Sequence, residues 1–287
     1  MKEVKNVFCN LCPDQTSGLF ILKNIYDPNK DQRSRIQKAR WIPPLSILCG
    51  LGLWELFVDL SGYPPFILPA PSRIWNRFLS AGKAGILWPN VWVTFYEVLL
   101  GLLIGTAAAA AAGYLLAHSP AAEQIIFPYI VVSQAIPLAA IAPLLIIWFG
   151  SGIKPKILIC ALVVFFPLLI NILVGYRDLE KNLCDLMTSM KADRWSRFRF
   201  LELPGTLPVV LGGLRISATL SVIGAVVGEL SGADAGLGYL ISIARGQYDT
   251  ALVFVAVLML MIIALALYGG VLLLEKKLLI WNTEDRA

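Results

Sequence analysis

Six long blocks of apolar residues decide what this chain can fold into. They span approximately residues 42–60, 91–117, 124–149, 156–176, 207–231 and 250–274. Each block can cross about 30 Å of hydrocarbon at a helical rise of about 1.5 Å per residue. The blocks must be helices, because an unpaired backbone group in lipid costs several kcal/mol and the blocks do not alternate as the strands of a barrel would. The sequence therefore predicts an all-α integral membrane protein with about six transmembrane helices.

The composition agrees with a membrane protein and argues against other classes. Of the 287 residues, 57% are hydrophobic and 15% are charged, and the mean hydropathy is +0.72. These values exclude intrinsic disorder, collagen and a small disulfide scaffold, and they nearly exclude a soluble enzyme. The net charge of +5 could suggest nucleic acid, but no recognition motif accompanies it. Basic residues beside apolar blocks usually contact lipid headgroups, so membrane lipid is the expected partner and nucleic acid is not.

The distribution of Lys and Arg predicts the orientation in the membrane. With residues 1–40 placed inside, the inside loops and tails hold 17 Lys and Arg, whereas the outside loops hold six. The positive-inside rule then predicts a multi-pass protein of the cell inner membrane with both termini in the cytoplasm. We expect a polar cytosolic tail at 1–40, a membrane domain at 41–275 and a cytosolic C-terminal tail at 276–287.

A polar but regularly patterned stretch, residues 178–208, lies between the fourth and fifth blocks. Its apolar residues recur at helical spacing, first Leu183, Leu186, Met187 and Met190, and then Trp195, Phe198 and Leu201 beyond a polar break. This pattern predicts two short cytoplasmic helices joined by a turn at residues 191–194. Pro204 and Pro208 are expected to end the second helix and to start the next span.

This stretch resembles the cytoplasmic signature of permease subunits of ATP-binding cassette (ABC) importers. In that signature an acidic-Ala-Ala triplet is followed by three residues and a Gly, and later by Leu-Pro. The resemblance implies a coupling segment that docks on the ATPase subunit through Asp185, Leu186, Met187, Lys191, Ala192, Leu203 and Pro204. Lys191 stands where Gly is usual. Because Lys adopts a positive φ less readily than Gly, either the turn is built differently here or the alignment is shifted by one residue.

Further segments resemble the permeases of the nitrate, sulfonate and taurine importer type, and the resemblance covers residues 64–275. They are Leu68-Pro69-Ala70-Pro71-Ser72, the stretch 143–150, and Gly236-Leu237-Gly238-Tyr239. Within this group, residues 165–167, 224–229 and 236–239 look most like permeases for the pyrimidine precursor of thiamine.

The resemblance implies a subunit that forms a translocation path and is not an enzyme. The solute would be small and polar or anionic, such as nitrate, sulfonate, taurine, bicarbonate or a thiamine pyrimidine precursor. The implied partners are two copies of an ATPase subunit that carries ATP and Mg²⁺, an extracytoplasmic solute-binding protein and a second permease copy, which suggests a homodimer. No P-loop or common hydrolase motif occurs, so no cofactor is expected in this chain. The alternative is an ion-coupled secondary transporter, which an inverted repeat or paired membrane carboxylates would favour.

Two prolines and one carboxylate are candidates for the translocation path. Pro137 and Pro143 interrupt the third block, and interrupted helices commonly line transport paths. Glu229 lies near the predicted outer end of the fifth block, where it could line the external mouth because a carboxylate facing lipid would be costly. The alternatives are that Glu229 is a helix-end residue already in water, or that it is fixed by the loop that starts at Ser231.

The sequence offers no set of metal ligands. Its five cysteines have no regular spacing, and the Cys9-x-x-Cys12 pair with the single histidine, His118, supplies too few ligands for tetrahedral zinc. His118 is expected to be solvated in a turn. Glu97, near the outer end of the second block, is expected to reach water.

Overall fold

The computed structural model describes residues 28–279, with side chains from residue 45 onward. The described residues form helices and contain no strand, which confirms the all-α prediction. The chain divides into two compact units, Met1–Gly62 and Tyr63–Ala287. The described part of the first unit is helix α2 (Pro28–Ser61), which contains the first apolar block. The predicted boundary between residues 40 and 41 lies inside α2 and stays a prediction, and the Cys9-x-x-Cys12 pair lies outside the described residues.

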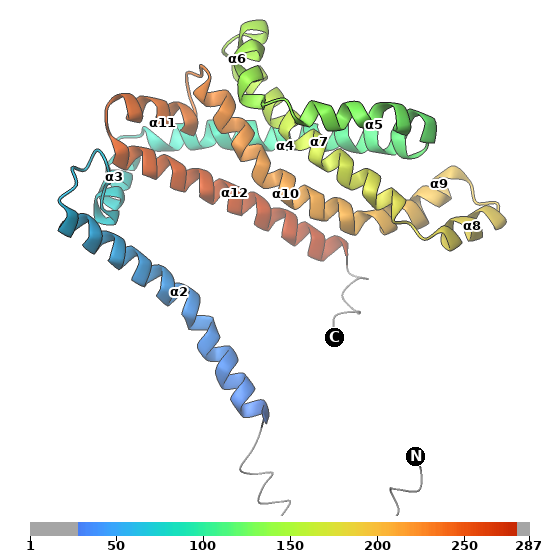
Figure 1. The fold of residues 1–287 in the computed structure, drawn as a ribbon, viewed down its shortest axis with the longest axis horizontal. Coiled ribbons are helices and arrows are strands. Elements are labelled where there is room, and N and C mark those ends of the chain that lie inside the picture. Colours follow the sequence, from blue (N-terminus) through green and yellow to red (C-terminus); the bar gives the residue numbers. More distant parts are fainter. Residues whose placement is uncertain (1–27, 280–287) are drawn as a thin grey trace, which may run out of the picture. The chain divides into compact units, whose positions relative to one another are not determined.

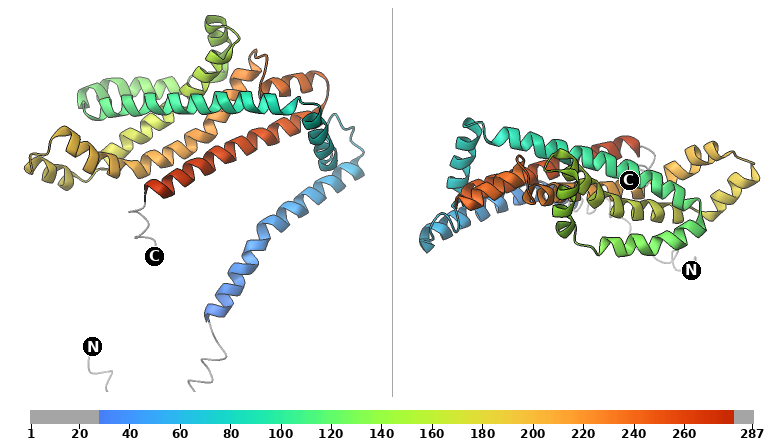
Figure 2. Two further views of the ribbon diagram at one scale, coloured as in Figure 1. Left: turned by 180° about the vertical axis from the view of Figure 1, so that it is seen from behind. Right: turned by 90° about the horizontal axis from the view of Figure 1, so that it is seen from above.

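Helices also build the second unit (Figure 1). They are α3 (Pro71–Lys83), α4 (Leu87–Ala117), α5 (Pro120–Gln134), α6 (Leu138–Phe149), α7 (Ile153–Arg177), α8 (Lys181–Ser189), α9 (Arg194–Arg197), the π-helical turn η1 (Phe198–Glu202), α10 (Leu203–Leu230), α11 (Leu237–Gly246) and α12 (Thr250–Leu278). Figures 1 and 2 show α8 and α9 at one end of this unit, here called the coupling end, and α3 and α11 at the opposite end.

Helix α7 is the central element of the second unit, because it packs along both α4 and α10. Leu168 and Leu169 of α7 are almost fully buried against Leu102 and Ala109 of α4. Glycines allow the backbones to approach closely. A Cβ atom at Gly105 of α4 would lie 2.7 Å from the carbonyl oxygen of Ala161, so only glycine fits there without a shift of α7.

The structure supports membrane spans but does not confirm six of them. In the described part of the chain, four helical stretches are long and apolar enough to span, namely α4, α7, the continuous stretch Arg194–Leu230, and α12. The third apolar block forms two helices, α5 and α6, bent by 94°, and counts as a fifth span only if the pair is one span. Pro137 lies at this break, where its ring and missing N–H stop α5 from continuing. Helix α2 is not part of this count.

The second coupling helix does not end at Pro204, so that prediction is wrong. Helix α9 continues through η1 into α10 without a loop. The N–H of Leu203 donates to the carbonyl of Phe198, five residues back, which is a π-type hydrogen bond. Pro204 therefore falls in the first turn of α10, where a missing backbone donor costs little, and Pro208 is accommodated inside that helix.

We predict opposite effects of adding one methyl group at two helical glycines. Gly105→Ala should destabilise the protein by about 1–3 kcal/mol, because the new Cβ overlaps α7. Gly270→Ala in α12 should be neutral or stabilising by up to about 1 kcal/mol, because nothing lies within 4 Å of its Cβ position and Ala favours helix. Thermal unfolding of the two purified variants measures this difference, and equal melting temperatures would contradict the close contact of α4 and α7.

Candidate functional site

The turn between α8 and α9 contains the residue that departs from the ABC permease signature. Lys191 has a φ of 53°, so the turn adopts the left-handed conformation expected at the position of the usual Gly. The N–H of Ala192 donates to the carbonyl of Met187, and the N–H of Lys191 donates to that of Thr188. These two bonds are a Schellman motif, which satisfies carbonyls at the end of α8. The turn is therefore of the kind that Gly makes, at a conformational cost of about 1 kcal/mol for a non-Gly residue.

A side-chain cap begins the next helix. The N–H of Ser196 donates to Oδ1 of Asp193 at 3.4 Å, so Asp193 caps the start of α9. Hydrogen bonding to Ser196 lowers the pKa of this exposed carboxyl below its usual value. The Schellman motif and the cap together fix the chain between the two helices from both sides.

The first of these helices exposes apolar side chains. No residue of α8 is buried, and Leu186 is 54% and Met190 is 69% exposed. Asp185 is also exposed, whereas Met187 and Ala192 are partly buried. An exposed apolar helix face of this kind is typical of a protein interface. The described chain thus offers a surface for a partner, and contact of these residues with an ATPase stays a prediction.

A buried carboxylate holds the second helix against the α4–α5 turn. Glu202 is 3% exposed, and its Oε1 lies 3.2 Å from Nε2 of His118 and 3.0 Å from Nε of Arg197. The ring of His118 also contacts the rings of Tyr114 and Tyr176. His118 lies in the turn with 41% of its side chain exposed, as expected, but it also contacts a buried carboxylate. The structure brings it to a partner that lies 84 residues away in the sequence.

The break in the third apolar block borders a cavity of about 320 Å³. Ile136 and Leu138, on either side of Pro137, line it together with Ser133, Gln134, Ile141, Leu162, Val163, Phe166, Pro167 and Leu220. None of these lining residues is charged. Pro137 and Pro143 do not line the cavity themselves, and their role in a translocation path stays a prediction.

At the opposite end, Glu229 is held inside the protein. It is 1% exposed, its Oε1 accepts a hydrogen bond from Oγ1 of Thr94 at 2.6 Å, and its Oε2 accepts one from the N–H of Gly238 at 2.5 Å. The N–H of Leu237 donates to the same Thr94 hydroxyl at 2.8 Å. Glu229 thus ties α4 and α10 to the start of α11. This geometry favours the alternative in which Glu229 fixes the loop that starts at Ser231.

A second buried carboxylate lies beside this network. Glu97 is 0% exposed, and Nζ of Lys156 lies 2.7 Å from its Oε1. The same Lys156 amine donates to the carbonyl of Ala235 at 3.1 Å. The expectation that Glu97 reaches water is wrong, because a lysine from α7 neutralises it inside the helix bundle. Arg215 of α10 is similarly paired with Glu275 of α12, at 3.0 Å.

The described side chains suggest no metal centre. Among residues 45–279, no group of three or more His, Cys, Asp or Glu side chains is placed to hold a metal ion. The polar groups described above pair with one another, and they hold helices and loops in place.

Comparison with known proteins identifies the family. Residues 98–280 match the family described as the binding-protein-dependent transport system inner membrane component. The chain belongs to this family. It is therefore a permease subunit of a binding-protein-dependent ABC importer and a multi-pass protein of the inner membrane. The family is a non-enzymatic membrane component, and membership decides against the ion-coupled secondary transporter.

Relatives of the nitrate, sulfonate and taurine type confirm the narrower resemblance. The permease is 43% identical to the riboflavin transport system permease protein RibX of Chloroflexus aurantiacus over 86% of this chain and 93% of that protein. It is 31% identical to the formylaminopyrimidine transport permease protein ThiX of Halalkalibacterium halodurans over 85% and 96%. It is 29% identical to the taurine transport system permease protein TauC of Escherichia coli over 89% and 98%.

A solved structure shows the same fold. A chain of the MetNI methionine ABC transporter matches with a TM-score of 0.56 at 16% identity, over 66% of the permease and 96% of that chain. The likeness supports the helical architecture of the second unit.

We predict that Glu229→Gln destabilises the permease by roughly 1–3 kcal/mol, because an amide has one acceptor oxygen and leaves a buried donor unpaired. The matched control is Asp234→Asn, which removes a charge from an exposed position of the adjoining loop. Melting temperatures and solute uptake at matched amounts of assembled complex separate the two roles of Glu229. Normal stability with altered uptake would instead support a place in the translocation path.

Proposed function

We propose that the permease forms the translocation path for riboflavin or a closely related ring-bearing solute. The observation that carries this proposal is the 43% identity to the riboflavin permease, against 31% and 29% to the formylaminopyrimidine and taurine permeases. The uncharged cavity at the α5–α6 break supports it. The sulfonate group of taurine or a nitrate ion would favour a cationic side chain, whereas a neutral ring system fits apolar walls with Phe166, Ser133 and Gln134.

We propose that two permease copies form the path and that two ATPase subunits drive it. Support comes from the family description and from the likeness to an ABC transporter. ATP and Mg²⁺ would bind to the ATPase subunits, an extracytoplasmic binding protein would deliver the solute, and this chain would need no cofactor. The Lys and Arg count supports an orientation with both termini and the coupling end in the cytoplasm.

In this proposal the coupling segment passes ATPase closure to the membrane helices. Asp185, Leu186, Met187, Lys191 and Ala192 form the docking surface, whereas Leu203 and Pro204 join it to α10. Support comes from the exposed apolar face of α8 and from the uninterrupted path from α9 into α10. Closure of the ATPase pair would move the two coupling segments together and switch the path between outward and inward access.

The transport proposal is tested by uptake of labelled riboflavin into vesicles that hold the permease with its ATPase and binding protein. We expect ATP-dependent uptake that excess unlabelled riboflavin abolishes and that excess taurine leaves unchanged. Phe166→Leu should raise the KM about 2- to 10-fold through loss of an aromatic contact. Phe149→Leu, in α6 but outside the cavity, serves as the control. Uptake of taurine or formylaminopyrimidine without uptake of riboflavin would contradict the proposed solute.

The docking proposal is tested by one buried charge. Leu186→Asp should weaken ATPase binding by about 2 kcal/mol or more, because an unpaired charge would be desolvated at the contact. Asn182→Asp adds the same charge at an exposed position of the same helix that lines no cavity, and it should leave ATPase binding intact. Co-purification of the ATPase with each variant gives the answer, and full retention by Leu186→Asp would rule out α8 as the docking helix.

A further inference from the structure

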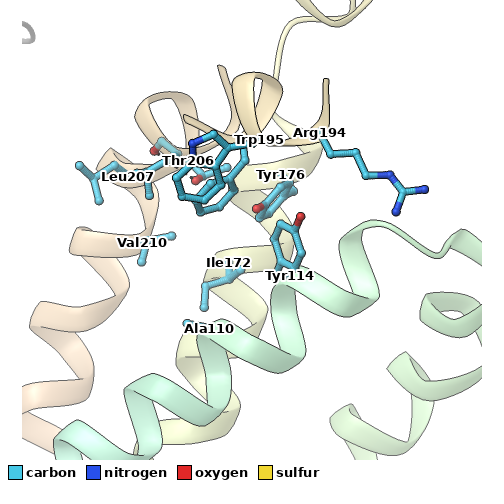
Figure 3. A pocket seen from close by; sticks show the side chains of 11 residues that line it. Ala110, Tyr114, Ile172, Tyr176, Arg194, Trp195, Thr206, Leu207 and Val210 are labelled. Carbon is cyan, nitrogen blue, oxygen red and sulfur yellow. Dashed lines mark hydrogen bonds between the residues drawn. The ribbon is translucent and has the colours of Figure 1, made fainter. Parts of the chain in front are cut away.

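Two cavities of different chemistry adjoin at the coupling end. The first has a volume of about 550 Å³ and is lined mainly by apolar side chains, among them Ile172, Trp195, Leu207 and Val210 (Figure 3). The second has a volume of about 860 Å³ and is lined by many polar and charged side chains. Both cavities include Tyr114, Tyr176 and Arg194 in their walls. They therefore form one amphipathic site.

The polar cavity carries an excess of positive charge. Arg177, Lys181, Arg194 and Arg197 line it, against the two carboxylates of Glu123 and Glu202. Arg177 pairs with Glu123 at 2.5 Å, and Arg197 pairs with Glu202 at 3.0 Å. Among the described residues, no carboxylate lies within ion-pair distance of Lys181 or Arg194. Two cations are thus available to an anionic ligand.

The position of the cavities along the spanning helices orients such a ligand. Tyr114 and Tyr176 lie in the last turns of α4 and α7, and Trp195 lies in the first turn of α9. Tyr and Trp at the ends of spans are typical of headgroup depth. From there the apolar cavity extends along the helices to Ala110 and Val210, toward the hydrocarbon. Figure 3 shows the Trp195 and tyrosine rings close together, with the Arg194 side chain running outward from them.

We propose that the joined cavities bind one anionic phospholipid. Its phosphate lies against Lys181 and Arg194, and an acyl chain lies in the apolar cavity beneath Trp195. A free anion would leave the apolar walls unused, and a neutral lipid would leave the two cations unpaired. Basic pockets between membrane helices are known to bind anionic headgroups. The inference does not depend on which solute the permease carries.

The lipid would bridge the two helices of the coupling segment. Lys181 begins α8 and Arg194 begins α9, so one phosphate group would contact the first residue of each helix. The bound headgroup would then hold the two helices at a fixed spacing beside the docking surface. Anionic lipid would in this way support the geometry on which ATPase docking depends.

Native mass spectrometry of the purified permease–ATPase complex tests this site. Phosphatidylglycerol and phosphatidylcholine of equal chain length are added at equal concentration, and the lipid bound to each complex is counted. The wild type should retain phosphatidylglycerol in preference. The double variant Lys181→Gln with Arg194→Gln should bind it roughly 10- to 30-fold more weakly, because each removed cation near the surface costs severalfold in affinity. The matched double variant Arg199→Gln with Lys276→Gln, whose positions line neither cavity, should bind like the wild type.

A second variant tests the acyl chain separately. Val210→Trp fills the apolar cavity and should abolish retention of phosphatidylglycerol. If the Val210→Trp complex does not assemble, Trp195→Ala replaces it and should weaken that retention. Equal retention of the two lipids, or wild-type retention by the Lys181 and Arg194 double variant, would overturn the proposal. Displacement of the lipid by inorganic phosphate at equal concentration would assign the site to a free anion. Retention of phosphatidylglycerol by the isolated permease but never by the permease–ATPase complex would show that the ATPase fills the cavities, and it would also overturn the proposal.

Discussion

The close approach of α7 to α4 and α10 is the contact on which the rest of the structure depends. In lipid, the hydrophobic effect does not drive helices together, so association depends on packing and on polar contacts between helices. Gly105 supplies the packing by letting the α4 backbone reach α7. The ion pair of Glu97 with Lys156 joins the same two helices nearer their N-terminal ends. Once α7 is fixed between its neighbours, α4 and α10 present their ends to the loops and short helices that complete the unit.

The two ends of the second unit use buried carboxylates for a similar purpose. At the coupling end, Glu202 contacts the side chains of His118 and Arg197, which connect the α4–α5 turn to the helix that leads into α10. At the opposite end, Glu229 accepts hydrogen bonds from a side chain of α4 and from the backbone of α11. Each carboxylate ties elements that are remote in sequence. Each would be costly to bury without these partners.

Features set by neighbouring residues could be predicted from the sequence. The apolar blocks predicted the helices because a backbone in lipid has no other way to satisfy its polar groups. The helical spacing of Leu183, Leu186 and Met190 predicted α8, and the polar break after it predicted the turn that begins at Lys191. The sequence also indicates a break of the third apolar block at Pro137. The size of the bend, 94° between α5 and α6, does not follow from the proline alone.

Features set by distant residues could not be predicted. Nothing in the sequence near Glu97 indicates that Lys156, 59 positions away, neutralises it. Nothing near His118 indicates Glu202. The continuity of α9 with α10 was also missed, because a local rule ends helices at proline, whereas a π-type hydrogen bond just before Pro204 places that residue in a first turn.

The absence of a loop between α9 and α10 has a mechanical consequence. The helical stretch from Arg194 to Leu230 contains 37 residues, which corresponds to a path of roughly 55 Å at 1.5 Å per residue, and it bends where α9 and η1 meet α10 (Figure 1). No loop interrupts the helical backbone, so a displacement imposed at Arg194 would be passed through the bend into α10 and along it toward Leu230. Glu229 lies at the far end of this stretch, where its hydrogen bond to Gly238 would pass the displacement directly to α11.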